Sequence, residues 1–166
     1  MTLEEVDIRT PTERDGGDIW RAARDAGTLD VNAPYSYLLL GKHFGGTSAV
    51  AKRGGKTVGF VTGFRPPGKP DTWFVWQIGV DAEARGQGIG RRLLEHVLGR
   101  PDNADIRYLE ATVSPSNAAS RSLFFGLARS LGLDCDISEG FPAELFPDGA
   151  HEKEELYRIG PFTYQS

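Results

Sequence analysis

The feature that most constrains this chain is an apolar, aromatic segment that runs into a glycine-rich turn and then into a helix. Trp73 to Val80 has strand character, and the turn that follows reads Arg85-Gly-Gln-Gly-Ile-Gly90. Glycines at alternate positions let the backbone approach a ligand closely. The N–H groups at the start of a helix point toward the same place and carry partial positive charge. The turn is therefore predicted to bind an anion, most often a phosphate group.

The other segments alternate between strand and helix patterns. Strands are expected near 6–10, 48–53, 57–64, 72–80, 107–113, 134–138 and 154–159. Helices are expected near 19–27, 35–44, 90–98 and 117–131, with a loop at 139–150. Three antiparallel strands followed by a β-α-β crossover predict an α/β fold with a mixed, mostly antiparallel sheet and helices on both faces. No repeat or linker divides residues 1–166, so one domain is expected.

Composition narrows the class of protein. A net charge of −4 gives no reason to expect a nucleic-acid partner, and no apolar run approaches the roughly 20 residues of a membrane helix. The first six residues are acidic and lack the apolar core of a signal peptide. The single cysteine, Cys135, excludes an internal disulfide. These observations fit a soluble, cytoplasmic protein without a membrane partner.

The spacing of the glycines shows which of the known phosphate-binding motifs this turn does not match. A P-loop requires Lys and then Ser or Thr after its last glycine, whereas Arg91-Arg92 follows Gly90 here. The dinucleotide fingerprint requires Gly-x-Gly-x-x-Gly, whereas the glycines here stand at 86, 88 and 90. A flexible turn without a ligand is the remaining alternative, but arginines flank the glycines on both sides and favour an anion.

The turn, placed between a strand and a helix, resembles the Arg/Gln-x-x-Gly-x-Gly/Ala motif of the GCN5-related N-acetyltransferase (GNAT) superfamily. The resemblance implies that the strand backbone pairs with the pantetheine arm of acetyl-CoA, the co-substrate, and that the loop amides hold its pyrophosphate. No metal is expected. Gly79 fits a bulge in the strand. The coenzyme residues implied by position are Ile78, Gly79, Val80, Arg85, Gly86, Gln87, Gly88, Ile89, Gly90 and Arg91.

A second stretch, Ser114 to Phe125, resembles the next coenzyme motif of the family, in which an Asn opens a helix and touches the pantetheine. Asn117 matches this Asn, and Ser120 and Phe124 are assigned to the coenzyme with it. The alternative is a plain helix cap, which Ser116 or Asn117 would serve equally well, and the two roles are compatible. Phe124 stands where the family often has a tyrosine that protonates the departing thiolate, and a phenyl ring cannot donate a proton. The proton donor is therefore unassigned, and Cys135 is expected to be a buried, inert thiol.

Three further stretches resemble the subfamily that acetylates the γ-amine of L-2,4-diaminobutyrate for synthesis of the osmolyte ectoine, a response to osmotic stress. They are Asp30-Val-Asn-Ala-Pro-Tyr-Ser-Tyr-Leu-Leu39, Trp73 to Asp81 and His151 to Tyr157, and the likeness runs from about Ile8 to Pro161. The substrate residues implied are Asp30, Tyr35, Trp76, His151 and Glu154.

The reaction requires an uncharged amine. An amine with a pKa near 10.4, as for lysine, is deprotonated at pH 7 at a cost of about 4–5 kcal/mol. Glu154 or His151, directly or through water, is the expected base before direct attack of the amine on the thioester. Without the resemblance, Asp30 reads as a turn residue, His151 as a solvated loop histidine and the glutamates as a solvated face.

Two other functions remain open from the sequence. One is acetylation of a different amine, such as a peptide N-terminus or an aminoglycoside. The other is a regulatory acetyl-CoA binder without catalysis, which only the missing tyrosine favours. The family likeness also implies a homodimer with both C-terminal regions near its interface.

Overall fold

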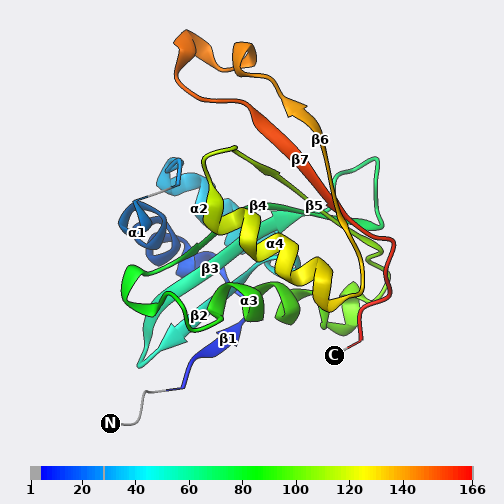
Figure 1. The fold of residues 1–166 in the computed structure, drawn as a ribbon. Coiled ribbons are helices and arrows are strands. Elements are labelled where there is room, and N and C mark those ends of the chain that lie inside the picture. The colour runs from blue at the N-terminus through cyan, green and yellow to red at the C-terminus, as the bar shows by residue number, and fades with distance from the viewer. Residues whose placement is uncertain (1–4, 28, 166) are drawn as a thin grey trace. The chain divides into compact units, whose positions relative to one another are not determined.

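The computed structural model of the chain describes residues 5–27 and 29–165 (Figure 1). These residues form two compact units. The first unit takes in the described residues up to Phe64 together with Trp76–Ala104 and Gln165. The second takes in Arg65–Val75 and Asp105–Tyr164. Each unit is built from separated stretches of the chain, and strand β4 (Thr72–Val80) runs from the second into the first.

The first unit contains a sheet in the order β1-β2-β3-β4. β1 pairs antiparallel with β2, and β2 pairs antiparallel with β3. Its elements are β1 (Asp7–Arg9), α1 (Gly16–Ala26), α2 (Pro34–His43), β2 (Ala49–Arg53), β3 (Lys56–Phe64), the second half of β4 and α3 (Ile89–Leu98). Short 3₁₀ turns lie at Glu13–Asp15, Gly45–Thr47, Ala82–Ala84 and Pro101–Asn103.

Local sequence explains where these elements begin and end. Gly54 and Gly55 both have positive φ, 56° and 78°, as a two-residue hairpin turn between β2 and β3 requires. α1 ends at Gly27, whose φ of 72° is the left-handed conformation that terminates many helices. Pro34 occupies the first turn of α2, where its missing N–H has no partner to lose.

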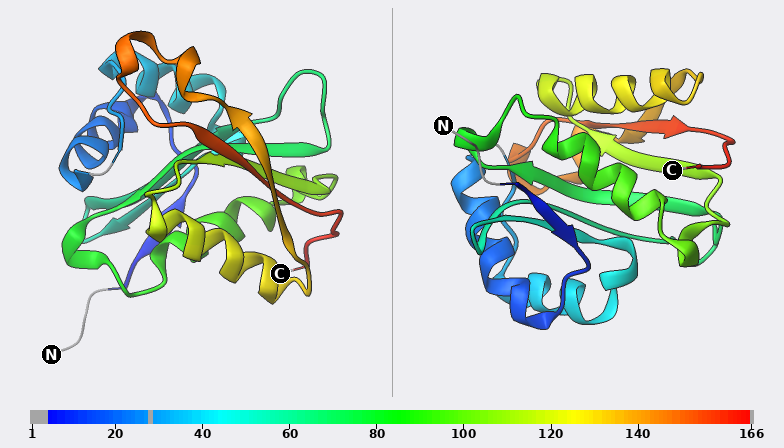
Figure 2. Two further views of the ribbon diagram at one scale, coloured as in Figure 1. Left: turned by 45° about the horizontal axis from the view of Figure 1, so that its top comes forward. Right: turned by 90° about the horizontal axis from the view of Figure 1, so that it is seen from below.

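Helices cover both faces of the sheet in this unit, as Figure 2 shows for β2 and β3. Phe60 belongs to the buried cluster formed with α1 and α2, which includes Ile19 and Tyr37. A Cβ on the adjacent Gly59 would instead lie 3.3–3.4 Å from Ile89 and Leu93 of α3. Because successive strand residues face opposite sides, α1 and α2 lie on one face and α3 on the other. The expected arrangement is confirmed.

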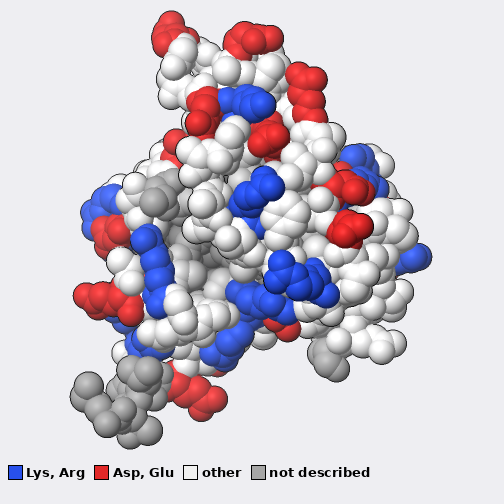
Figure 3. All heavy atoms as spheres, viewed as in Figure 1, with Lys and Arg blue, Asp and Glu red and all other residues white. Residues whose placement is uncertain are grey.

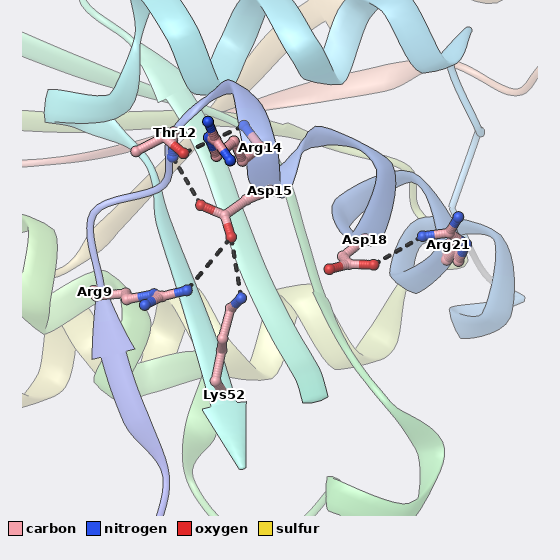
Figure 4. A network of polar contacts seen from close by, with 7 residues as sticks. All are labelled: Arg9, Thr12, Arg14, Asp15, Asp18, Arg21 and Lys52. Atoms are coloured by element: carbon pink, nitrogen blue, oxygen red, sulfur yellow. Dashed lines mark hydrogen bonds and ion pairs between the residues drawn. The ribbon is translucent and has the colours of Figure 1, made fainter. Parts of the chain in front are cut away.

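The turn before α1 is held by a buried carboxylate, Asp15 (Figure 4). Asp15 accepts a hydrogen bond from the backbone N–H of Thr12 at 2.8 Å, and lies 3.1 Å from Lys52 and 3.7 Å from Arg9. Burial by itself raises the pKa of Asp15, but the Thr12 hydrogen bond and the two cations outweigh it, so this pKa lies below its ordinary value. Asp15 thus ties the start of α1 to β1 and β2.

Replacing Asp15 with Asn is expected to lower the free energy of unfolding by about 2 kcal/mol at pH 7, because a charged hydrogen-bond partner is lost. Since the folded pKa is depressed, this stabilisation is present above the unfolded pKa, about 3.9, and disappears as the pH falls through the folded pKa. The gap between the parent and Asp15→Asn should therefore narrow below about pH 4. Chemical denaturation at pH 7 and pH 3 measures it.

Asp18→Asn is the matched control, because Asp18 makes an exposed pair with Arg21 at 2.8 Å (Figure 4). An exposed pair contributes less than about 1 kcal/mol. Equal losses in the two variants, or a gap for Asp15→Asn that does not depend on pH, would contradict the role given to Asp15.

The second unit contains the first half of β4, β5 (Tyr108–Val113), α4 (Ala118–Ser130), β6 (Cys135–Phe141) and β7 (Glu154–Ile159). Its strand order is β4-β5-β7-β6. β4 and β5 are parallel, while β5 and β6 pair antiparallel with β7. The sheet is therefore mixed and mostly antiparallel, and the element order agrees with the order expected from the sequence.

One detail of the prediction from the sequence was wrong. β6 continues to Phe141, where a loop from 139 was expected, because Glu139 and Phe141 still pair with β7. The register shifts between them at Gly140, where a Cβ would lie 2.5 Å from the Glu154 carbonyl oxygen. The first 3₁₀ turn is capped by Thr12, whose hydroxyl accepts a hydrogen bond from the Arg14 N–H at 3.3 Å.

The connection between β6 and β7 contains 3₁₀ turns at Ala143–Leu145 and Pro147–Gly149. Figure 3 shows acidic side chains gathered at this tip, where Glu144, Asp148 and Glu152 are exposed. Such a surface favours cationic over anionic ligands. In the part of the chain that the structure describes, no helix is long and apolar enough to cross a membrane.

Candidate active site

The glycine-rich turn lies between β4 and α3 in the first unit. Gly86 and Gly88 have φ of 78° and 76°, a left-handed backbone that glycine adopts without strain. Gly88 is the N-cap of α3 and provides no side-chain cap to the N–H groups of the first helical turn. The N–H groups of this first turn can therefore donate hydrogen bonds to an anion such as a pyrophosphate.

Arg85 and Arg91, the arginines on either side of this turn, make hydrogen bonds and an ion pair within the protein. Arg85 donates to the carbonyl oxygens of Ala26 at 2.9 Å and Val80 at 3.3 Å, and so ties the turn to the end of α1. Arg91 pairs with Glu95 one turn further along α3 at 3.1 Å. The backbone N–H groups are therefore the main anion-binding groups that this geometry offers.

Arg53 is a residue that the sequence reading missed. From the end of β2 it donates to Gln87 Oε1 at 2.5 Å and so brings a positive charge to the glycine-rich turn. No pattern in the sequence connects the two residues, because they are 34 positions apart.

The three strand residues assigned to the coenzyme, Ile78, Gly79 and Val80, are half-buried. The β4–β5 register ends at Val75↔Ala111, so these residues lie beyond its last pair. A Cβ on Gly79 would lie 2.9 Å from the Phe60 ring and 3.0 Å from Leu29. Close packing against these side chains therefore explains the glycine.

The residues of the first unit that the sequence assigned to the substrate lie on α2, β4 and the loop before α2. Asp30 and Tyr35 are exposed, and Trp76 exposes 42% of its surface. The carbonyl oxygen of Asp30 accepts a hydrogen bond from Gln77, the neighbour of Trp76, at 2.5 Å. The structure therefore brings the Asp30 loop to the strand that carries Trp76.

In the second unit, Asn117 caps α4. Its side-chain oxygen accepts from the backbone N–H of Ser120 at 3.1 Å, which confirms the helix-cap reading. Phe124 is 2% exposed and meets the Tyr157 ring edge-on, with 6.3 Å between centroids. Phe124 is therefore part of the packing between α4 and β7.

Residues 151–154 are fastened to the segment before α4. The hydroxyl of Ser114 donates to Glu154 Oε2 at 3.1 Å. Ser116 donates its backbone N–H at 3.1 Å and its hydroxyl to Glu152, and these bonds lower the pKa of Glu152. The two serines are further residues that the sequence reading did not connect with the acidic run, since 40 and 36 positions separate the partners.

His151 lies at the start of this run. Its ring stacks on Phe146 with 4.5 Å between centroids, and its Nδ1 is 2.5 Å from the Glu152 carbonyl oxygen. Because a carbonyl can only accept, Nδ1 carries the proton, and Nε2 of the neutral ring is the basic nitrogen. His151 can therefore act as a proton acceptor through Nε2.

Two other chemistries find little support in the described residues. Burial, with a smaller effect of Asp136, raises the pKa of the Cys135 thiol to about 11. Such a thiol is a weak acid and a poor proton donor, in line with the inert thiol expected. Within residues 5–27 and 29–165, no group of three or more His, Cys, Asp or Glu side chains is arranged to hold a metal ion.

A strand–glycine turn–helix unit beside a mixed, mostly antiparallel sheet is the architecture of an acetyl-CoA-dependent N-acetyltransferase. Residues 17–127 match the Acetyltransferase (GNAT) family, and the chain belongs to that family.

Two similar proteins have a more specific named activity than the family as a whole. It is 45% identical over 162 residues to L-2,4-diaminobutyric acid acetyltransferase from Marinococcus halophilus, covering 98% of this chain and 94% of that protein. It is 48% identical over 154 residues to the enzyme of the same name from Shouchella clausii (strain KSM-K16), covering 93% and 86%.

A solved structure of an enzyme with the same named activity is also similar to this chain. The diaminobutyrate acetyltransferase EctA from Paenibacillus lautus, in complex with its substrate L-2,4-diaminobutyric acid and coenzyme A, is 44% identical to this chain. The TM-score is 0.93, and the match covers 98% of this chain and 99% of that one.

Proposed function

We propose that this chain transfers the acetyl group of acetyl-CoA to the γ-amine of L-2,4-diaminobutyrate and forms N-γ-acetyl-diaminobutyrate for ectoine synthesis under osmotic stress. The observation that carries the proposal is the TM-score of 0.93, over nearly the full chain, to an enzyme in complex with diaminobutyrate and coenzyme A. The two relatives at 45% and 48% identity have the same named activity.

The coenzyme assignment rests on the backbone of β4, the glycine-rich turn and the start of α3. The N–H groups from Gly86 to Arg91 hold the pyrophosphate, and the backbone of Ile78 to Val80 pairs with the pantetheine. The left-handed glycines and the N-terminus of α3 without a side-chain cap support this role. Asn117 and Ser120 at the start of α4 contact the pantetheine, whereas Phe124, which was assigned to the coenzyme with them, is 2% exposed and packs against Tyr157 instead.

The acceptor is a short diamino acid with two ammonium groups and one carboxylate. Asp30 and Glu154 attract and orient the ammonium groups, and Trp76 provides a wall or a cation–π face for the carbon chain. Tyr35 and His151 complete the set. The exposed acidic tip between β6 and β7 raises the local concentration of such a cation.

The reaction is a direct transfer. Glu154 or His151 accepts one proton from the γ-ammonium group, and the neutral nitrogen attacks the thioester carbonyl carbon. A backbone N–H near Ile78 to Val80 stabilises the resulting oxyanion. The C–S bond then breaks as the carbonyl re-forms, coenzyme A leaves as a thiolate, and the new amide nitrogen releases its second proton to water or to the departing thiolate. The pKa of a free thiol is about 8.5, so departure near neutral pH without an acid is feasible.

The chain acts as one acetyltransferase domain in a cytoplasmic homodimer. An exposed strand edge at β6, with Ile137 and Phe141 at 37% and 50% exposure, is compatible with contact between copies near the C-terminus. Sedimentation equilibrium should give twice the 18.1 kDa mass of the chain. A monomer at micromolar concentration would end this part of the proposal.

Free thiol release from acetyl-CoA, measured against a panel of amines, tests the function. Diaminobutyrate should be turned over much faster than peptide N-termini or aminoglycosides, and NMR of the product should show acetyl on the γ nitrogen. Turnover with a different amine alone would replace the proposed substrate. Binding of acetyl-CoA without turnover of any amine would instead indicate a regulatory binder.

A further inference from the structure

A closed ring of hydrogen bonds ties the loop before α2 to β4. The backbone N–H of Asn32 donates to the Tyr37 hydroxyl oxygen at 3.3 Å, and that hydroxyl donates to Gln77 Oε1 at 2.8 Å. Gln77 Nε2 then donates to the carbonyl oxygen of Asp30 at 2.5 Å. The chain of donors and acceptors thus begins at Asn32 and ends at Asp30 of the same loop. Because all the bonds run in the same direction, each bond strengthens the next.

The two side chains of the ring are fixed by the core. Tyr37 is fully buried, and its ring meets Phe60 edge-on with 6.5 Å between centroids. Gln77 is 8% exposed on β4. Buried polar groups must be paired, and therefore the loop is held in the single arrangement that satisfies both side chains.

The chemistry of the ring requires an amide at position 77. One end of the side chain must accept from a hydroxyl, and the other must donate to a carbonyl. A carboxylate could only accept, and a thioether could do neither well. A phenylalanine at position 37 would remove both the acceptor for Asn32 and the donor for Gln77.

We propose that Gln77, acting with Tyr37, is a positioning residue for the acceptor. It holds the backbone of Asp30 at a fixed place relative to Trp76 and Ile78, its neighbours on β4. The inference rests on the proposed function, which assigns Asp30 and Trp76 to the diamino acid and Ile78 to the coenzyme. Binding of the diamino acid, and with it kcat/KM, depends on this placement, because a shift of about 1 Å in a positioning group can lower the rate about 100-fold.

Steady-state kinetics of Gln77→Met and Tyr37→Phe test the inference. We expect kcat/KM for diaminobutyrate to fall roughly 10- to 100-fold, mainly through KM, if Asp30 is displaced by up to about 1 Å. The affinity for coenzyme A should stay nearly unchanged. Ile19→Val, in the same buried cluster as Tyr37, is the control: it loosens the core and should leave KM unchanged.

The same substitutions in an Asp30→Ala background separate positioning from general loosening. If Gln77 acts by placing Asp30, then introducing Gln77→Met into Asp30→Ala should raise KM by less than about twofold, because the effects of coupled residues are not additive. An undiminished effect in that background would overturn the inference. A KM in Gln77→Met equal to that of the parent would do so as well.

Hydrogen exchange gives a readout that does not depend on the substrate. In the substrate-free protein, the Asn32 amide should exchange faster in Gln77→Met and Tyr37→Phe and at the parental rate in Ile19→Val. Unchanged exchange in the first two variants would refute the ring. If the Asn32 amide exchanges faster in both variants but the parent protein does not acetylate diaminobutyrate, the ring is supported and the proposed function is overturned.

Discussion

Replacing Glu154 with Gln should lower kcat about 100- to 10,000-fold at neutral pH, the usual contribution of a general base. The γ-ammonium group resembles lysine, so the neutral amine at pH 7 lies about 4–5 kcal/mol above the ammonium form. A nearby carboxylate lowers this barrier by accepting the proton as the attack begins. Gln keeps the shape of Glu and can still accept the hydrogen bond of Ser114, which measures 3.1 Å to Glu154.

The pH profile distinguishes loss of a base from loss of structure. Without the carboxylate, the variant depends on amine that has ionised in solution, so its rate should rise about tenfold per pH unit toward the amine pKa near 10.4. Glu155→Gln is the matched control, because Glu155 is the next residue on β7 and faces the other side of the sheet. A parental rate and profile in Glu154→Gln would remove Glu154 from the mechanism.

His151→Ala decides between the two candidate bases. The basic nitrogen of His151 is Nε2, since Nδ1 lies 2.5 Å from a carbonyl oxygen and carries the proton. If the two residues pass the proton as a unit, the double variant should be no slower than the slower single variant. Full turnover in both single variants across the pH range would exclude both assignments.

The largest expected effect on stability is that of Gly41→Ala. Gly41 is buried in α2, and a Cβ there would lie 2.8 Å from the carbonyl carbon of Thr12. Gly16 of α1 repeats this close approach, because its Cβ would lie 2.9 Å from the Leu38 Cα. Since backbone cannot move aside cheaply, the methyl group should reduce the free energy of unfolding by about 3 kcal/mol.

Gly17→Ala is the matched control with an effect of opposite sign. Gly17 is also helical, but its Cβ would meet only the flexible end of Arg21, at 3.6 Å. Alanine in place of a helical glycine should therefore stabilise the protein by about 0.5–1 kcal/mol. Thermal unfolding measures both, at roughly 2–4 °C per kcal/mol for a chain of this size. Stabilisation by Gly41→Ala would contradict the close packing of α2 on the Thr12 turn.

Element order and type were predictable because their signals are local. The paired glycines at 54 and 55 specify a hairpin, and Gly27 ends α1, through φ values that few other residues adopt. The apolar residues of α3 recur at helical spacing, and three of them, Leu93, Leu94 and Val97, are fully buried. The end of β6 was missed because pairing with β7, and not the residues of 139–141 themselves, keeps them extended.

By itself, the sequence determined the local conformation of the loop that we propose binds the coenzyme. A strand, left-handed glycines and the first turn of a helix follow one another between β4 and α3, so local conformation alone builds an anion site. Only the tertiary structure decided which side chains hold the residues that we propose bind the substrate. Gln77 meets Tyr37 and Asp30 across 40 and 47 positions, and Ser114 meets Glu154 across 40. Such contacts depend on the register of strands and the packing of helices, which no periodicity within one segment encodes.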